Sequence, residues 1–179
     1  RWRACWPAAT ASATCLSEAQ VEAVQKLYGG PVTEDGVALY PGHEAIGSEL
    51  GWTGWIVGMG NMGSMATGIG SGYLKYLGFP QSPPASYQSA DWYFTTDGFD
   101  QLRTEGATYN ATNPDLTGFV DHGGKLILYH GWADPAISPF GTVAYYQAVQ
   151  DKMGGLEATQ DFARLYMVPG MFHCSGGDA

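Results

Sequence analysis

The chain has 179 residues, and 45% of them are hydrophobic, which is enough for a domain with a buried core. Eight Lys and Arg stand against seventeen Asp and Glu, so the formal net charge is −9. This charge argues against nucleic acid and anionic membrane surfaces as partners. No apolar run approaches the roughly 20 residues of a membrane-spanning helix, and no apolar signal core follows residues 1–3, so no export signal is expected within the chain.

The first expected helix begins at Ser17, which can cap it, with Gln20 three residues later as in a capping box. Apolar residues from Val21 onward recur at helical spacing, and the Gly-Gly-Pro sequence at 29–31 ends the helix. From about Pro31 to Pro84 the chain is rich in Gly and aromatic residues, with no long period. This composition predicts a lid or excursion. Residues 80–84 predict a break, and residues 91–105 predict irregular structure or a short helix.

The pattern is clearer after residue 120. Residues 125–130 form a continuous apolar run between glycines, which predicts a strand buried on both faces. Residues 142–153 are helical in character, and residues 162–168 form a second strand-like run before Pro169. A strand, a helix and a strand in this order predict a βαβ unit with a parallel sheet, so the fold class is α/β.

Reactive side chains follow both predicted strands, where open α/β sheets place their ligands. Asp134 follows the first strand and His173 the second, the order in which an α/β-hydrolase supplies the last two members of its catalytic triad. By spacing alone, a turn aspartate and a surface histidine remain the alternative. A metal set of His130, Asp134, His173 and Cys174 matches no zinc spacing, so no metal ligands are assigned.

The three cysteines make an odd number. Cys5 and Cys15 are ten residues apart, short enough to close a local loop, whereas Cys174 lies near the other end. Three reduced thiols in a cytosolic protein are one interpretation. The other is a local bridge with one cysteine paired outside the chain, in an oxidising compartment.

Residues 123–137 (GGKLILYHGWADPAI) and 165–177 (LYMVPGMFHCSGG) closely resemble the tannase and feruloyl esterase family, which includes hydrolases of mono(2-hydroxyethyl) terephthalate. Residues 15–31 and 110–119 are also similar, and residues 47–52 are similar more loosely. The resemblance implies the C-terminal part of an α/β-hydrolase: residues 1–119 as the end of the lid and a connecting region, and residues 120–179 as the hydrolase segment.

The same resemblance implies roles for individual residues. Asp134 corresponds to the triad acid, His173 to the general base, and Cys174 to half of a disulfide with a cysteine beside the nucleophilic serine. Cys5 and Cys15 match a second disulfide of the family, near the lid. The resemblance allows a structural calcium in the complete enzyme, but its loop falls before Arg1, so no ligands are assigned in this chain.

No serine of the chain lies in a nucleophile elbow, which needs Gly two positions before and two positions after it; Ser64, Ser71, Ser138 and Ser175 all fail. The serine is therefore expected on an N-terminal hydrolase portion linked through Cys174. The predicted activity is hydrolysis of hydroxycinnamate, gallate or terephthalate-type esters by a secreted or periplasmic enzyme. Trp132 and Ile137 flank Asp134 and are candidate substrate contacts. The alternative is an inactive fragment or a module that binds aromatic ligands.

Overall fold

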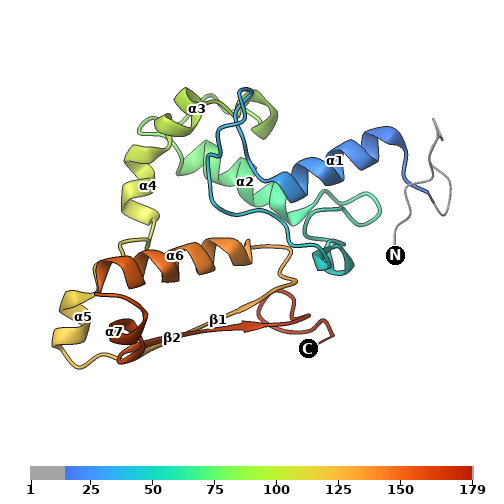
Figure 1. The fold of residues 1–179 in the computed structure, drawn as a ribbon. Coiled ribbons are helices and arrows are strands. Elements are labelled where there is room, and N and C mark those ends of the chain that lie inside the picture. The colour runs from blue at the N-terminus through green and yellow to red at the C-terminus, as the bar shows by residue number, and fades with distance from the viewer. Residues whose placement is uncertain (1–14, 179) are drawn as a thin grey trace.

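A computed structural model describes residues 15–178 (Figure 1). In chain order the α-helices are α1 (Glu18–Gly29), α2 (Met65–Tyr76), α3 (Thr96–Gln101), α4 (Arg103–Tyr109), α5 (Thr117–Asp121), α6 (Pro139–Lys152) and α7 (Leu156–Gln160). The strands are β1 (Leu126–Gly131) and β2 (Ala163–Val168), and two short 3-10 helices are η1 (Ser48–Gly51) and η2 (Ser89–Asp91). Within the described residues, no helix is long and apolar enough to cross a membrane.

The prediction for α1 is confirmed in detail. The Ser17 backbone N–H donates to Gln20 Oε1 at 2.9 Å, and the Gln20 N–H donates to Ser17 Oγ at 3.3 Å, which together form a capping box. The helix stops where Gly30 adopts φ +75°, a conformation that strains residues with a side chain.

Helix α2 lies between residues 31 and 84, where the sequence predicts a lid or excursion and shows no long period. Ser64 caps it by accepting from the Thr67 N–H at 3.2 Å, but Leu74 is the one residue that it buries. Three glycines, at 68, 70 and 72, lie inside this helix, and glycine disfavours a helix interior, so the sequence argues against a helix there. Residues 91–105 were predicted to form either irregular structure or a short helix. The structure has short helices there.

The βαβ unit is confirmed. Strands β1 and β2 pair in parallel, with Leu128 opposite Leu165 and Gly131 opposite Val168, and α6 lies between them in the chain. Helix α6 begins at Pro139, three residues before the predicted start, because proline suits the first position of a helix. Helix α7, which was not predicted, precedes β2.

The core lies between α6 and the inner face of this sheet. Its buried members are Tyr146, Val149, Phe162 and Ala163. The partly buried residues around them come from α5 and its approach, both strands and α6: Leu116, Val120, Leu126, Leu128, Tyr145, Met153 and Leu165. The Tyr146 hydroxyl donates to the Ala163 carbonyl at 3.1 Å, so α6 is joined to β2 by a buried hydrogen bond as well as by apolar contact.

The outer face of the sheet corrects the prediction of a strand buried on both sides. Ile127 is 71% exposed, Tyr129 61% and Tyr166 53%. Side chains alternate between the two faces of a strand, and the described residues place a helix, α6, against one face only. The uninterrupted apolar sequence therefore reflects two apolar faces, one of which no element within residues 15–178 covers.

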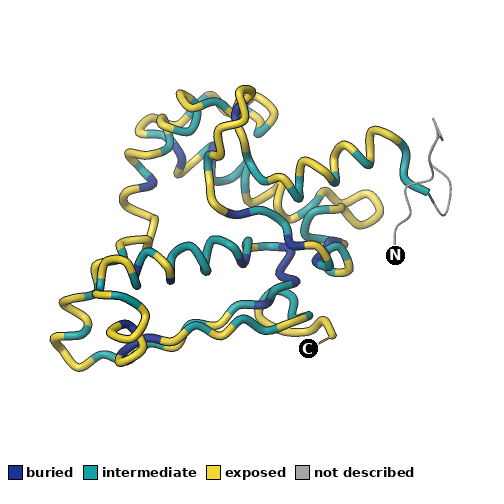
Figure 2. The backbone as a smooth tube through the Cα atoms, viewed as in Figure 1, coloured by how far each residue is buried: buried dark blue, intermediate teal, exposed yellow. Residues whose placement is uncertain are grey.

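Helices α1 to α4 lie on one side of α6, and the β1–β2 sheet lies on the other (Figure 1). Buried residues gather where the chain leaves β1 and enters α6, next to the segment of residues 42–52 (Figure 2). The proposed division between residues 119 and 120 falls inside α5 and stays a prediction. The expected Cys5–Cys15 bridge involves Cys5, which lies outside the described residues, and it also stays a prediction.

Candidate active site

Backbone hydrogen bonds bring the loops after β1 and β2 together. The Trp132 N–H donates to the Val168 carbonyl at 2.9 Å, and the Ala133 N–H donates to the Met171 carbonyl at 3.1 Å. This approach requires Gly131, because a Cβ there would lie 2.1 Å from the Met171 carbonyl oxygen. The two loops thus meet at the carboxyl ends of parallel strands, the usual place for a site in an α/β sheet.

Asp134 lies at the centre of this junction, with its side chain only 4% exposed. Its Oδ1 accepts from the backbone N–H groups of Ala136 at 2.8 Å and Ile137 at 3.0 Å. Burial by itself raises the pKa of Asp134, but the hydrogen bonds from Ile137, His173 and Ala136 outweigh it, and the pKa lies below its usual range. The group is therefore a carboxylate, and both of its oxygens act as acceptors.

His173 is the partner that the strand order predicted for Asp134. Its Nδ1 lies 3.0 Å from Asp134 Oδ2, so Nδ1 carries a proton and donates it to the carboxylate. Nε2 has no hydrogen-bond partner among the residues that the structure describes, and the side chain is 32% exposed. In the neutral ring Nε2 holds a lone pair, which is the arrangement of a general base.

Two neighbours of this pair were not assigned a role by the sequence analysis. The His130 ring, at the end of β1, places Nε2 3.1 Å from Asp134 Oδ2 and Nδ1 2.7 Å from Thr142 Oγ1. Trp55 packs its edge against the His173 ring with the ring centroids 4.9 Å apart. The adjacency of His130 to the Asp134 loop was a visible signal, whereas nothing in the sequence around Trp55 indicates its partner.

A small cavity of about 280 Å³ lies over the two triad candidates. Its lining consists of Tyr129, His130, Gly131, Asp134, Ile137, Met171, His173 and Cys174. Of the two predicted substrate contacts, Ile137 lines this cavity and Trp132 does not. Trp132 instead lies against the Phe140 ring and lines a separate hollow with Phe172.

Cys174 follows the base directly and lines the same cavity. It is exposed, its thiol is free within the described part of the chain, and its φ of +63° is unusual for a residue with a side chain. No described serine hydroxyl is hydrogen-bonded to His173: Ser64 caps α2, and Ser138 is bonded to the backbone of His43.

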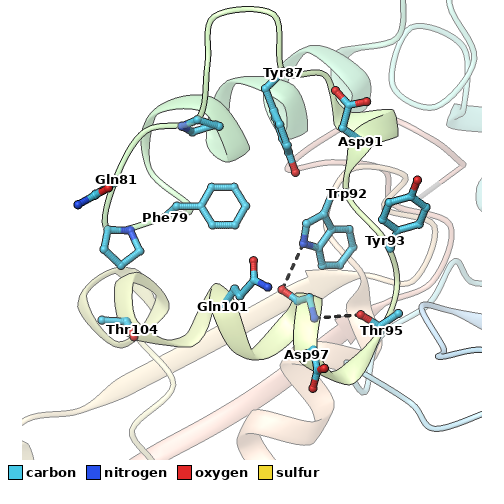
Figure 3. Close-up of a pocket in the computed structure, with 13 residues that line it drawn as sticks. Phe79, Gln81, Tyr87, Asp91, Trp92, Tyr93, Thr95, Asp97, Gln101 and Thr104 are labelled. Carbon is cyan, nitrogen blue, oxygen red and sulfur yellow. Dashed lines mark hydrogen bonds between the residues drawn. The ribbon is translucent and has the colours of Figure 1, made fainter.

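A larger hollow, of about 810 Å³, lies away from this junction among η2, α3 and α4. Figure 3 shows the rings of Phe79, Tyr87 and Trp92 and the Gln101 amide around it. The Trp92 indole N–H donates to the Gly98 carbonyl at 3.2 Å, which holds that ring in place. Neither Asp134 nor His173 lines this hollow, so it is separate from the reactive pair.

The segment of residues 42–52 packs against the loop that carries Asp134 and the start of α6. The Ser138 hydroxyl accepts from the His43 N–H at 2.9 Å and donates to the His43 carbonyl at 2.7 Å, and Phe140 stacks on the His43 ring. Ser48, which is fully buried, donates to Glu44 Oε2 at 3.0 Å and accepts from the Trp52 indole at 2.9 Å. A second acidic group is thereby held near Asp134.

The pKa of Glu44 is shifted in the opposite direction from the pKa of Asp134. Burial raises the pKa of Glu44, the hydrogen bonds from Ser48 and Trp52 oppose this, and the charge of Asp134 adds to the rise. Asp134 has enough donors to stay ionised, whereas Glu44 has too few to offset its burial. The pKa values of the two carboxyl groups are therefore shifted in opposite directions, and the group with the lowered pKa faces the histidine.

The described residues contain no group of three His, Cys, Asp or Glu side chains placed to hold a metal ion. At the reactive junction both histidines direct N–H groups at one oxygen of Asp134, so their lone pairs do not converge on a common point. The calcium that the family resemblance allows has no candidate ligands among these residues.

Comparison with known proteins agrees with the resemblance. The profile of the family described as tannase and feruloyl esterase matches residues 3–179. Mono(2-hydroxyethyl) terephthalate hydrolase of Piscinibacter sakaiensis is 33% identical over 191 residues, covering 93% of this chain and 31% of that protein. A probable feruloyl esterase B-2 of Neosartorya fischeri is 32% identical over 190 residues, covering 97% of this chain and 31% of that protein.

Two solved structures are also similar to this chain. The crystal structure of feruloyl esterase B from Aspergillus oryzae superposes with a TM-score of 0.73 at 28% identity, over 92% of this chain and 31% of that one. The crystal structure of another esterase from Aspergillus oryzae superposes with a TM-score of 0.77 at 24% identity, over 98% of this chain and 33% of that one. The chain spans about a third of the length of the relatives it matches.

We predict that Glu44→Gln makes the protein at least as stable as its parent at pH 7. Because the pKa of Glu44 is raised on folding, its contribution to stability is fully present below the unfolded value of about 4.3 and is lost as the pH rises through the folded value. The amide that replaces the carboxyl group keeps an acceptor for Ser48 and carries no charge. Thermal midpoints of both proteins between pH 4 and pH 8 test this, and a variant equally destabilised at every pH would contradict it.

Proposed function

Because the chain belongs to the tannase and feruloyl esterase family, we propose that it supplies the acid and the base of a carboxylic ester hydrolase. The observation that carries the proposal is the 3.0 Å hydrogen bond between His173 Nδ1 and the buried carboxylate of Asp134. The chain spans about a third of its relatives, so the activity is proposed for the complete enzyme.

In the proposed reaction His173 Nε2 removes the proton from a serine hydroxyl as the serine oxygen attacks the ester carbonyl. Asp134 holds the ring in the Nδ1–H tautomer and stabilises the imidazolium that forms. The protonated His173 then gives its Nε2 proton to the leaving alcohol. Water, activated by the same nitrogen, hydrolyses the acyl-enzyme and regenerates the serine.

The serine is proposed to come from sequence outside this chain. None of the serines here has the glycine spacing of a nucleophile elbow, and within residues 15–178 none is bonded to His173. The partly exposed His173 ring and the small cavity beside it leave the base accessible to a group from elsewhere. In this proposal, residues 120–179 are the last part of an α/β-hydrolase sheet and the preceding residues are the end of its lid.

The proposed substrates are esters of aromatic acids, of the hydroxycinnamate, gallate or terephthalate type. The printed names of the relatives support this class, since one acts on mono(2-hydroxyethyl) terephthalate and others are feruloyl esterases. The cavity is lined on one side by Tyr129, Ile137 and Met171, and Trp55 lies against the base. Such surfaces suit an aromatic acyl group, which binds by ring packing and apolar burial.

One observation favours a second function, the binding of aromatic ligands without hydrolysis. The hollow of about 810 Å³ among Phe79, Tyr87 and Trp92 is larger than the cavity at His173 and is separate from it (Figure 3). Ligand binding that persists when Asp134 and His173 are replaced, in a protein with no esterase activity, would support this function over the first.

Cys174 is proposed to form a disulfide with a cysteine beside the serine, in an enzyme that is secreted or periplasmic. Its thiol is exposed next to the base, where a nucleophile-bearing loop would have to lie. A covalent link there would hold base and nucleophile loops together.

We predict that Asp134→Asn in the complete enzyme lowers kcat by about 10³- to 10⁴-fold, because the amide favours the wrong tautomer of His173. His173→Ala is expected to lower kcat at least as much. Rates of hydrolysis of methyl ferulate, methyl gallate and mono(2-hydroxyethyl) terephthalate test this. His122→Ala is the matched control, since His122 is an exposed histidine that bonds only to the Gly118 carbonyl. Activity within threefold of the parent in His173→Ala would rule out the proposal.

We predict that Ile137→Ala changes the discrimination between ferulate and terephthalate esters by roughly threefold or more in kcat/KM, because loss of apolar contact affects acyl groups of different shape unequally. Ile69→Ala on α2, an exposed isoleucine outside the cavity, is the control. Equal effects of Ile137→Ala on all esters would exclude Ile137 as a specificity contact.

The disulfide proposal predicts a difference in the intact mass of the native protein with and without reductant. Peptide mapping of the unreduced protein should join Cys174 to a cysteine beside a serine. Cys174 recovered as a free thiol would contradict the disulfide proposal and favour the non-catalytic alternative.

A further inference from the structure

Asp134 Oδ2 is shared by two histidines, and the proposed triad uses only one of them. His173 Nδ1 lies 3.0 Å from this oxygen and His130 Nε2 lies 3.1 Å from it. His173 reaches the oxygen from the loop after β2, whereas His130 reaches it from the end of β1. The carboxylate is therefore held between rings from both strands.

The hydrogen bonds of His130 determine its tautomer. Nε2 faces two acceptors, Asp134 Oδ2 and the Ile137 carbonyl, each at 3.1 Å. A carbonyl cannot donate and an ionised carboxylate cannot donate, so Nε2 must carry the proton. Nδ1 lies 2.7 Å from the Thr142 hydroxyl, which donates to it when the ring is neutral.

His130 is unsuited to act as the base itself. Its side chain is only 11% exposed, and both of its ring nitrogens are engaged. His173 is 32% exposed, and its Nε2 lacks a partner within residues 15–178. The two histidines on one carboxylate oxygen therefore differ: His173 has a lone pair available for a proton, whereas Nε2 of His130 acts as a donor, to Asp134 and to the Ile137 carbonyl.

We propose that His130 is a positioning residue for the hydrolysis, and this inference rests on the proposed function. Two backbone N–H groups hold Asp134 Oδ1, and His130 supplies a second donor to Oδ2, which defines the plane of the carboxylate. The Thr142 hydroxyl on α6 keeps the His130 proton on Nε2. Oδ2 is thereby presented to His173 Nδ1 in one orientation, and misplacement of such a group by about 1 Å costs on the order of 10²-fold in rate.

Two substitutions of His130 distinguish the effect of its Nε2–H donor from the effect of the space that its ring fills. A glutamine amide nitrogen reaches the place of imidazole Nε2, so His130→Gln keeps a donor to Asp134. An asparagine amide reaches only the place of Nδ1, so His130→Asn keeps a polar group near Thr142 and loses that donor. In the complete enzyme, His130→Asn is expected to lower kcat by roughly 10- to 100-fold with KM changed less than about twofold, and His130→Gln by less than about threefold.

A spectroscopic readout tests the inference without substrate. The Nδ1–H proton of His173 is expected to give a downfield NMR signal from its bond to Asp134. This signal should broaden or move upfield in His130→Asn and stay in place in His130→Gln. If hydrolysis is absent but the signal responds as expected, the proposed function fails and the positioning role stands. If Asp134→Asn abolishes hydrolysis while His130→Asn leaves kcat and the signal unchanged, the positioning role fails alone.

Thr142→Val provides a second test if His130→Asn does not fold. Without the hydroxyl, nothing on the Nδ1 side of His130 favours the Nε2–H tautomer. We therefore expect kcat to fall and the His173 signal to change as in His130→Asn, but by less. Thr142→Ser, which keeps the hydroxyl, should restore both. Equal losses in His130→Gln and His130→Asn, or parental behaviour of Thr142→Val, would show that His130 fills space and does not orient Asp134.

Discussion

The site depends on keeping one carboxylate charged inside the protein. An ionised carboxyl group removed from water is costly unless donors replace its hydration. Asp134 has four: two backbone N–H groups of its own loop on Oδ1, and the rings of His130 and His173 on Oδ2. The hydrogen bonds from Ile137, His173 and Ala136 outweigh the burial that would otherwise raise its pKa, so the group is an anion.

Three of the four donors lie within four residues of Asp134 in the sequence, and the sheet brings the fourth, His173, to them from 39 residues away. Parallel pairing places Gly131 opposite Val168, so both strands end at the same level and their loops meet. The loops can approach only because residue 131 has no Cβ. A shift in strand register would separate His173 from Asp134, and the apolar contacts of α6 with the inner face, through Leu128 and Leu165, oppose such a shift.

The segment of residues 42–55 contributes contacts that the strand loops do not provide. Ser138 at the start of α6 bonds both backbone groups of His43, and Trp55 packs against His173. This segment therefore contacts both His173 and the loop that carries Asp134. By contrast, the outer sheet face, with Ile127, Tyr129 and Tyr166 exposed, has no covering element in the described residues. An apolar face of this kind is typical of a surface that packs against further protein.

Local signals were sufficient for much of the fold. The capping box of α1 and the apolar runs of β1 and β2 each lie within a few residues, so they could be read directly. Helix α2 was not predicted, because glycine occupies three of its twelve positions and disfavours a helix interior. The burial of both faces of β1 was wrongly predicted, since an apolar run does not say whether this chain itself covers both sides.

For the site, the sequence by itself determined the order of an aspartate and a histidine after two parallel strands, which is enough to predict that their side chains meet. Only the tertiary structure decided the tautomer of His130, the contact of Trp55 with His173, the separation of Trp132 from the cavity and the bond between His43 and Ser138. The physical reason is distance along the chain. His43 and Ser138 are 95 residues apart, and which groups meet over that separation depends on how whole elements pack.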